Sequence, residues 1–509
     1  MKQLSRLFEP VSFWGLVLGV LSFLLIIFFT DLKPGHPEVT RTLAVAVLMA
    51  VWWVTEAVPL AVTALLPLVL FPALGVMNGS TVSSTYFNHI IFLFLGGFIV
   101  ALSMEKWNLH KRIALKIMIA IGVSPGRLLL GFMVATAFLS MWISNTATAM
   151  MMIPIGLSIV KELERNTSAA NVKKYSTGLF LAIAYSASIG GMATLVGTPP
   201  NLVLVKMLTI LFPKAPEITF SQWMIIGLPI SVSMLAVAWV LLYFSYKPEA
   251  KWEHLSIQSL REQYHTIDKI SQEQKVVLST FVVLALLWIT RTGISFEHFK
   301  IPGWSQIFGH PEYINDGTIA IAAAIFLFLI PSKNQPRQRI MDWKTANRLP
   351  WNMILLFGGG FALAKGFETS GLAIWFGEQL RWVGQFRPIW IILAITTMMS
   401  FLTELTSNTA STQMLLPVFA GLAVSIGINP FMIIIPVTMA ASLAFMLPTA
   451  TPPNAIVFGT ERIRIRTMIR TGFWLNMSGV LLIYVFIYLI EPGILHFHSL
   501  ALPGWAVIK

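Results

Sequence analysis

The chain has 509 residues, of which 56% are hydrophobic and 11% charged, and its mean hydropathy of +0.75 excludes a soluble globular domain and predicts a polytopic membrane protein. A formal charge of +13 does not indicate nucleic-acid binding, because the basic residues lie in short connections between apolar runs. Cysteine is absent, which excludes a disulfide framework and a thiolate metal site.

The first part of the chain contains four apolar runs that predict membrane-spanning helices. The first run follows Lys2 and Arg6, but it is long enough to cross a bilayer and lacks a small-residue cleavage pattern, so we interpret it as a retained helix and not as a signal peptide. Glu56 lies at a predicted helix end and is interpreted as a hydrogen-bonded carboxylate at the membrane interface. The predicted spans are 12–30, 42–59, 61–76 and a fourth that begins near His89.

Two segments resemble helices that lie in the membrane interface. The segment 105–122 mixes Lys and Arg with apolar residues at helical spacing, which is typical of such a helix. Its counterpart in the second half of the chain is 365–385. We predict two interfacial arms here and not two further spans.

Three short motifs occur twice with nearly constant separation, which predicts an internal duplication. The separation is 263 residues for Gly-Gly-Phe and for Ser-Asn-Thr, and 253 residues for Thr-Pro-Pro-Asn. Gly96 and Gly97 are interpreted as a close packing point between helices. The motifs lie at 96–98 and 359–361, at 144–146 and 407–409, and at 198–201 and 451–454.

Each Ser-Asn-Thr cluster lies in a long uncharged run. The 33 residues from 128 to 160 would form too long a single helix, with the polar cluster buried at its centre. We therefore predict a re-entrant hairpin with the cluster at its tip, and a second hairpin from 388 to 425. Consecutive prolines should break the runs 178–210 and 431–460 into half-helices.

The complete prediction is an all-α polytopic membrane protein with eleven spans and two re-entrant hairpins. Segments assigned to the cytoplasm hold 25 of the 35 Lys and Arg residues, which favours a cytoplasmic N-terminus and an extracellular C-terminus. An odd number of spans between the two copies gives them opposite orientations, as in the inverted-topology repeats of secondary transporters. The remaining spans are predicted at 220–245, 274–292, 315–332, 349–364 and 471–491.

The duplicated motifs predict one polar centre without any Lys, Arg or His. Hydroxyl, amide and freed carbonyl oxygens suit a hard cation such as Na⁺. An anion would be held by Asn and Thr donors and by half-helix N-termini, and bound Na⁺ would supply the missing positive charge, which is a physical basis for symport. The residues are Ser140, Ser144, Asn145, Thr146, Gly197 and Thr198, with Thr403, Ser407, Asn408, Thr409, Ala450 and Thr451.

These motifs, with Phe-Leu-Phe-Leu-Gly-Gly-Phe at 92–98 and Ala-Thr-Pro-Pro-Asn-Ala-Ile-Val-Phe-Gly at 450–459, resemble the divalent anion/sodium symporter family over nearly the whole chain. The resemblance is strongest to the bacterial sodium/dicarboxylate symporters. It implies a homodimer in the cytoplasmic membrane and uptake of C4-dicarboxylates such as succinate, malate and fumarate with at least two Na⁺ ions. It also implies an elevator movement of a transport domain, 125–245 and 388–509, against scaffold segments, 1–124 and 246–387.

The resemblance also implies the site residues. One sodium site uses Ser140, Ser144, Asn145 and the backbone of Gly197, and the other uses Thr403, Ser407, Asn408 and the backbone of Ala450. The substrate carboxylates meet Asn145, Thr146, Asn408 and Thr409, while Thr198, Pro199, Thr451 and Pro452 line the site. Many bacterial relatives have Ser at the position of Thr198, so the added methyl group leaves the substrate preference open.

Several alternatives stay open at this point. A sodium-independent dicarboxylate exchanger or a sodium/sulfate symporter would use the same fold, and a channel is a more distant alternative. A membrane-embedded hydrolase would need a base beside Ser144 or Ser407, where only Glu404 is available, so no enzyme is predicted. Glu404 is interpreted as a partner of a neighbouring helix in preference to a sodium ligand. No two histidines have metal-ligand spacing.

Overall fold

The computed structural model describes residues 10–122, 124–166, 168–248, 260–262, 264, 267, 269–296, 299–489 and 501–506. The described chain is helical apart from one antiparallel hairpin, β1 (Gly293–Phe296) and β2 (Phe299–Pro302), and a few isolated bridges. The all-α prediction is therefore confirmed. The predictions for Lys2, Arg6 and the chain end after 489 fall wholly or largely outside the described residues.

The N-terminal helices follow the predicted spans, one of them with an interruption. The predicted span 61–76 corresponds to the apolar helical segment Leu60–Ala73, whose regular hydrogen bonding is interrupted at Ala64 and Leu65. The Ala64 carbonyl instead accepts the Tyr86 hydroxyl at 2.5 Å, and Gly359 packs directly against Ala64. The helices are α1 (Pro10–Phe29), α2 (Pro37–Thr55), α3 (Leu60–Thr63), α4 (Leu66–Ala73), α5 (Gly79–Tyr86), α6 (His89–Lys106) and α7 (Leu109–Ile121).

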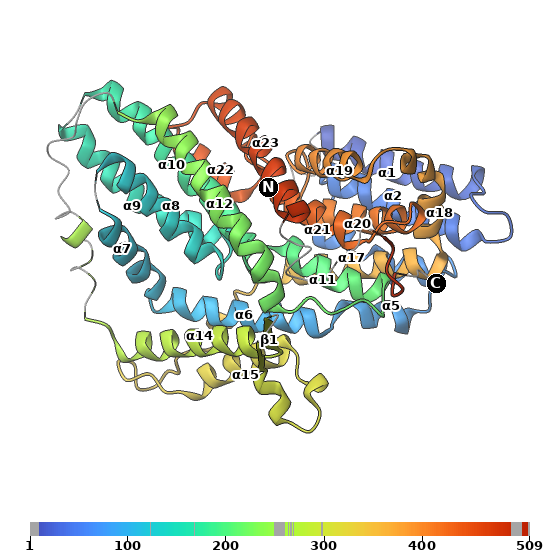
Figure 1. Cartoon of the computed structure of the whole chain (residues 1–509), viewed down its shortest axis with the longest axis horizontal. Helices are drawn as coiled ribbons and strands as arrows, with labels where there is room; N and C mark the ends of the chain where they lie inside the picture. The colour runs from blue at the N-terminus through green and yellow to red at the C-terminus, as the bar shows by residue number, and fades with distance from the viewer. Residues whose placement is uncertain are drawn as a thin grey trace.

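The first Gly-Gly-Phe motif is a packing point, as predicted. Gly96 of α6 lies against the backbone of Ala320 in α15 so closely that a Cβ atom would overlap it. This contact allows α6 and α15 to run side by side, next to α14 (Figure 1). The elements of this region are α14 (Gln272–Thr290), α15 (Asp316–Leu329), α16 (Trp343–Ala346) and the 3-10 turns Trp304–Ile307 and Pro311–Tyr313.

The first repeat has the predicted hairpin followed by the predicted broken helix. Proline at the first helical position begins α8 and α11, where its missing N–H is harmless. α12 begins with a capping box, in which Thr219 and Gln222 satisfy each other's backbone N–H groups. The helices are α8 (Pro125–Ser140), α9 (Asn145–Asn166), α10 (Ala169–Gly191), α11 (Pro199–Leu211) and α12 (Phe220–Tyr246).

The second repeat has the same order of elements. The predicted arm at 365–385 begins too early, because α17 continues through Lys365 to Ser370 and the arm is α18 with a 3-10 turn, Arg381–Gln385. The helices are α17 (Trp351–Ser370), α18 (Leu372–Gln379), α19 (Pro388–Leu402), α20 (Asn408–Ser425), α21 (Phe431–Ala440), α22 (Pro452–Phe458) and α23 (Ile465–Leu489).

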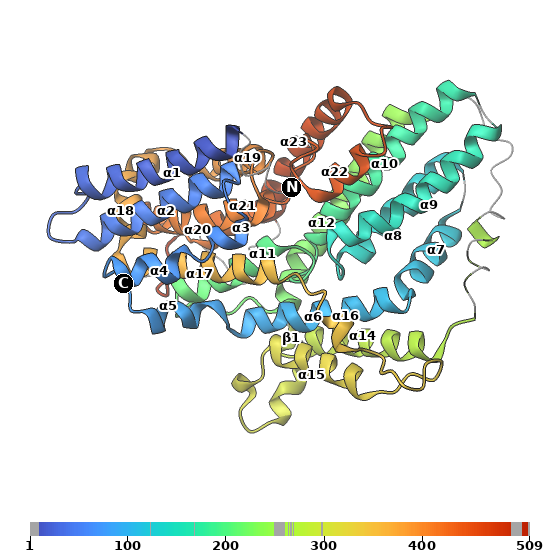
Figure 2. The ribbon, with the colours of Figure 1, turned by 180° about the vertical axis from the view of Figure 1, so that it is seen from behind.

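The two repeats exchange their short half-helices. α11 of the first repeat packs against α20 of the second, and α22 packs against α9 and α10 of the first. Figures 1 and 2 show α8, α9 and α10 on one side of the molecule and α18, α20 and α21 on the other. These contacts bring the tips of both hairpins together near the middle of the molecule.

Six helical segments of the described chain are long and apolar enough to cross a membrane. One of them is α9, which the sequence places in a hairpin, and several predicted spans correspond to shorter apolar helices such as α15 and α21. The count of eleven spans therefore remains a prediction. The six segments are Pro37–Thr55, Gly79–Lys106, Asn145–Arg165, Phe220–Tyr246, Gln272–Thr290 and Ile465–Ile487.

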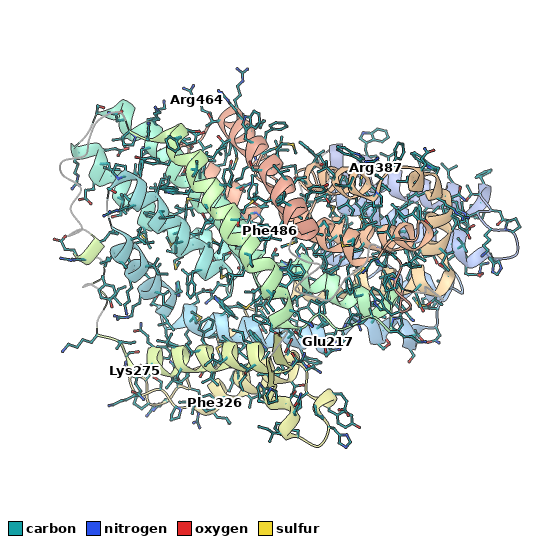
Figure 3. The ribbon with its side chains drawn as sticks, in the orientation of Figure 1. Glu217, Lys275, Phe326, Arg387, Arg464 and Phe486 are labelled. Carbon is teal, nitrogen blue, oxygen red and sulfur yellow. The ribbon has the colours of Figure 1, made fainter. Side chains whose placement is uncertain are left out.

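A buried ion pair fixes the start of α12 to α14 and α15. Arg291 Nε donates to Asp316 Oδ1 at 2.6 Å, and Arg291 Nη2 donates to Glu217, which Figure 3 labels, at 3.0 Å. The other carboxylate oxygen of Asp316 accepts the backbone N–H of Phe220 at 3.0 Å. Because both partners of the Arg291–Asp316 pair are buried, its two charges depend on each other.

We expect Arg291→Met to lower the free energy of unfolding by about 3–5 kcal/mol, because it leaves the Asp316 carboxylate buried without its cation. The double variant Arg291→Met/Asp316→Leu should recover part of this loss. Thermal unfolding of the purified protein in detergent measures both, with the exposed Arg381→Met as control. A double variant no more stable than the single one would contradict the interpretation.

Candidate functional site

The tip of the first hairpin is closed by its own polar side chains. α8 ends at Ser140 and α9 begins at Asn145, and the Ser140 hydroxyl donates to Asn145 Oδ1 at 2.6 Å. Ser144 Oγ accepts the backbone N–H of Ala147 at 3.2 Å, which caps the start of α9. The tip is therefore an ordered turn that presents oxygen atoms.

The tip of the second hairpin repeats this geometry. The Thr403 hydroxyl donates to Asn408 Oδ1 at 2.6 Å, and Thr403 Oγ1 also lies 2.9 Å from the carbonyl oxygen of Ala441. A hydroxyl has one proton, so three oxygen atoms share a single donor. An oxygen-rich cluster with unused lone pairs suits a hard cation.

The loop between α10 and α11 approaches the first tip closely. A Cβ atom at Gly191 would lie 2.7 Å from Asn145 Oδ1, and one at Gly197 would lie 2.5 Å from the Gly191 carbonyl oxygen. Only glycine allows this approach of the backbone. The Asn145 amide oxygen therefore lies among backbone carbonyls of the broken helix, where the sequence predicts a sodium site.

Two asparagines that the sequence assigns to no role organise the loops of the broken helices. Asn201 donates through Nδ2 to the carbonyl of Thr194 at 2.7 Å, and Asn454 donates to those of Ala444 and Leu447 at 2.9 and 3.0 Å. Both are fully buried. The only sequence feature that could have indicated this role is their position as the last residue of each Thr-Pro-Pro-Asn motif.

Both tips and both loops line one cavity of about 570 Å³. Its walls are completed by apolar side chains, among them Trp53, Phe94 and Phe98. Ser140 and Thr403 are fully buried directly behind the tips. The predicted site residues that line the cavity are Ser144, Asn145, Thr146, Gly197, Thr198 and Pro199 from the first repeat and Ser407, Asn408, Thr409, Ala450, Thr451 and Pro452 from the second.

Four helices begin at this cavity. α9 starts at Asn145, α11 at Pro199, α20 at Asn408 and α22 at Pro452, and all four of these residues line it. The aligned peptide dipoles put partial positive charge at each of these starts. α11 and α22 begin with two prolines that carry no N–H, and the next N–H groups, of Asn201 and Asn454, donate to Thr198 and Thr451, so these two helices offer the dipole and not free donors. None of the described lining residues is Lys, Arg or His. The cavity therefore favours an anion without using a basic side chain.

Glu56 is the one formally charged side chain among the described lining residues. It is exposed and makes no hydrogen bond or ion pair to another residue within the described chain, so the hydrogen-bonded interfacial carboxylate stays a prediction. The sequence placed Glu56 at a helix end correctly, since it caps the C-terminus of α2. The contact of this helix end with the centre could not be read from the sequence.

Glu404 organises the second broken helix from the side away from the cavity. Its carboxylate accepts the backbone N–H groups of Phe445, Met446 and Leu447 at 2.7, 2.8 and 3.0 Å, and the side-chain N–H of Asn476 at 2.8 Å. Four donors occupy the acceptor positions of a carboxylate. Glu404 is therefore a partner of the neighbouring segments, as predicted, and it fixes the loop that carries Ala441 and Ala450.

Curated relatives of this chain are transporters. The chain is 44% identical over 500 residues to the sodium-dependent dicarboxylate transporter SdcS of Staphylococcus saprophyticus, which covers 97% of this chain and 94% of the relative. It is 45% identical over 487 residues to SdcS of Staphylococcus aureus, with 94% and 91% covered. These relatives are named as transporters and not as enzymes.

Two solved structures have a similar fold. The YdaH transporter of Alcanivorax borkumensis matches with a TM-score of 0.54 at 14% identity, over 79% of this chain and 85% of that chain. MtrF of Neisseria gonorrhoeae matches with a TM-score of 0.57 at 13% identity, over 92% and 98%. At this identity the likeness concerns the fold alone, and it agrees with a polytopic helical membrane protein.

A family model described as the sodium:sulfate symporter transmembrane region matches residues 11–492, which is most of the chain. The duplicated tips, the broken helices and the shared cavity all lie inside this range. The chain therefore belongs to the sodium:sulfate symporter transmembrane region family.

Proposed function

We propose that this chain is a secondary active transporter that couples inward Na⁺ movement to the uptake of C4-dicarboxylates such as succinate, malate and fumarate. The observation that carries the proposal is the convergence of four helix N-termini and two oxygen-rich tips on one cavity without a basic side chain in the described lining. The names of the relatives from Staphylococcus support sodium and dicarboxylate as the transported species.

The cavity suits a small diacid. A volume of about 570 Å³ lies within the range of small-molecule sites. The two repeats present equivalent groups, Asn145 and Thr146 on one side and Asn408 and Thr409 on the other, so each repeat binds one carboxylate of a four-carbon diacid. Thr198 and Thr451, which precede α11 and α22, complete the donors on each side.

Sodium ions supply the charge compensation that the protein lacks. Helix N-termini stabilise a negative charge by about 0.3–2 kcal/mol each, which is little against the desolvation of a dianion. One Na⁺ binds at Ser140, Ser144, Asn145 and the Gly197 carbonyl, and the other at Thr403, Ser407, Asn408 and the Ala450 carbonyl. Anion and cations thus stabilise each other, and neither binds tightly alone.

The movement that we propose is an elevator. The hairpins, broken helices and following helices of 125–245 and 388–509 form the moving transport domain, and 1–124 with 246–387 form the scaffold of a homodimer in the cytoplasmic membrane. The interlocking of α11 with α20 and of α22 with α9 supports this division, because it ties both repeats of the moving part together. The cytoplasmic N-terminus and extracellular C-terminus follow from the distribution of basic residues.

Uptake of succinate into proteoliposomes should require an inward Na⁺ gradient, because the site holds a dianion only together with Na⁺. Radiolabelled succinate is measured with Na⁺, K⁺ or choline outside, and sulfate and citrate serve as competitors. Equal uptake in K⁺, stimulated by internal dicarboxylate, would show a sodium-independent exchanger. Inhibition by sulfate alone would show a sulfate symporter on the same fold.

We expect Asn145→Ala and Asn408→Ala each to reduce uptake at least about 100-fold, because each change removes a cation ligand and a substrate donor at once. The exposed Asn347→Ala is the control and should transport normally. Thermal unfolding in detergent shows whether the variants fold. Normal uptake by a folded Asn145→Ala variant would remove this residue from the site.

Glu404→Gln should raise the Na⁺ concentration for half-maximal uptake by about 10-fold or more. The neutral amide turns an N–H donor toward backbone N–H groups, so the loop that carries Ala441 and Ala450 loses its position. A Na⁺ titration of succinate uptake measures this effect, and Glu378→Gln, on a different helix, is the control. An unchanged Na⁺ dependence would contradict a positioning role for Glu404.

A further inference from the structure

One acidic residue lines a cavity that is otherwise suited to an anion. Glu56 lines the same space as Asn145 and Asn408, and no cation among the described residues compensates it. A negative side chain opposes the binding of a dicarboxylate, so its presence in this wall requires an explanation beyond substrate contact. The explanation offered below rests on the proposed sodium-coupled function.

The backbone holds Glu56 in this position. Its φ and ψ angles of 47° and 36° lie in the left-handed region, which glycine or asparagine occupies more readily at a helix end. Trp53 Nε1 donates to the carbonyl of Leu60 at 3.2 Å and so closes the turn around Glu56. A non-glycine residue that has a left-handed conformation and lines a cavity is a candidate for a functional role.

The charge of Glu56 adds to that of the helix it ends. The C-terminus of α2 carries partial negative charge from its unpaired carbonyl groups. The cavity therefore has a negative corner at Glu56 and positive helix ends at Asn145, Pro199 and Asn408. A cation that enters is attracted to the negative corner, and an anion that enters alone is repelled by it.

The size of this effect follows from the size of the cavity. A space of 570 Å³ is about 10 Å across, and two unit charges about 10 Å apart at an effective dielectric constant of about 20 change each other's binding roughly 10-fold. This loss of binding affinity applies to each negative charge of the anion that no cation compensates. A trianion therefore loses roughly 10-fold more affinity than a dianion.

We propose that Glu56 is a specificity-determining residue, which favours entry of Na⁺ before the anion and limits the charge of the anion that the site accepts. With Na⁺ in place, the repulsion on a dicarboxylate is offset. Without Na⁺, the same carboxylate keeps the dicarboxylate out of the cavity. The residue thus acts on coupling through its charge and does not need to touch the substrate.

The test uses Glu56→Gln in the full chain, reconstituted in proteoliposomes. The half-maximal Na⁺ concentration should rise about 3- to 10-fold, while the KM for succinate at saturating Na⁺ should fall by a similar factor. The preference for succinate over citrate, measured at about pH 8 where citrate is a trianion, should decrease about 10-fold. Opposite shifts for cation and anion distinguish a charge effect from structural damage, which would weaken both.

The chain offers matched controls. Glu461 has the same left-handed conformation, with φ of 58°, but does not line the cavity, so Glu461→Gln should leave all three quantities unchanged. Glu56→Asp should keep the wild-type pattern because it keeps the charge. Glu56→Asn removes the charge in a residue that accepts this backbone, and it should reproduce Glu56→Gln even if that variant folds poorly.

Two results would overturn the inference. If Glu56→Asn and Glu56→Gln leave the citrate preference unchanged, or shift the Na⁺ and succinate constants in the same direction, Glu56 does not select by charge. These outcomes are distinct from failure of the proposed function, in which the wild-type protein itself takes up succinate without Na⁺.

Discussion

The structure depends on one electrostatic constraint: a cavity in a low-dielectric protein, lined by polar hairpin tips and helix starts, contains no cationic side chain among its described walls. Each repeat contributes the same arrangement, a hairpin tip and a broken helix. The helix N-termini of both repeats lie at the same cavity. The duplicated prolines supply the breaks, because Pro199 and Pro452 begin a helix at a position where no preceding helix can continue. Helix ends would compensate the charge of the proposed anion only in part, which is why the proposed function includes mobile cations.

Buried hydrogen bonds and an ion pair outside the cavity hold the loops and helices that form it. Asn201 and Asn454 bind carbonyl groups of the loops that precede them, and the Arg291–Asp316 pair fixes the start of α12. Unpaired backbone groups at a broken helix would otherwise be costly inside a membrane. The polar side chains outside the cavity thus have as large a structural role as those that line it.

Sequence patterns predicted most of this architecture. The repeated Ser-Asn-Thr and Thr-Pro-Pro-Asn motifs placed both hairpin tips and both breaks, because prolines and polar clusters in apolar runs have few structural solutions. The interruption at Ala64 was missed, since it depends on Tyr86 and Gly359, which are distant in sequence. The position of Glu56 in the cavity and the roles of Asn201 and Asn454 were missed for the same reason, because tertiary contacts decide them. The number of spans is not resolved by helix length alone.

The two repeats differ at the residue that follows Ser140 in the first repeat and Thr403 in the second. Glu404 follows Thr403, while the equivalent residue after Ser140 is Met141, whose carbonyl accepts the Thr194 hydroxyl. The second loop is therefore held by a carboxyl group that accepts three backbone N–H groups, while the first is held by the Thr194 hydroxyl, which donates to Met141 and accepts the Gly197 N–H, beside the buried Asn201. A second repeat with methionine in place of Glu404 would leave the N–H groups of Phe445, Met446 and Leu447 without this acceptor. The two halves are therefore alike in the order of their elements and different in the side chains that hold their loops.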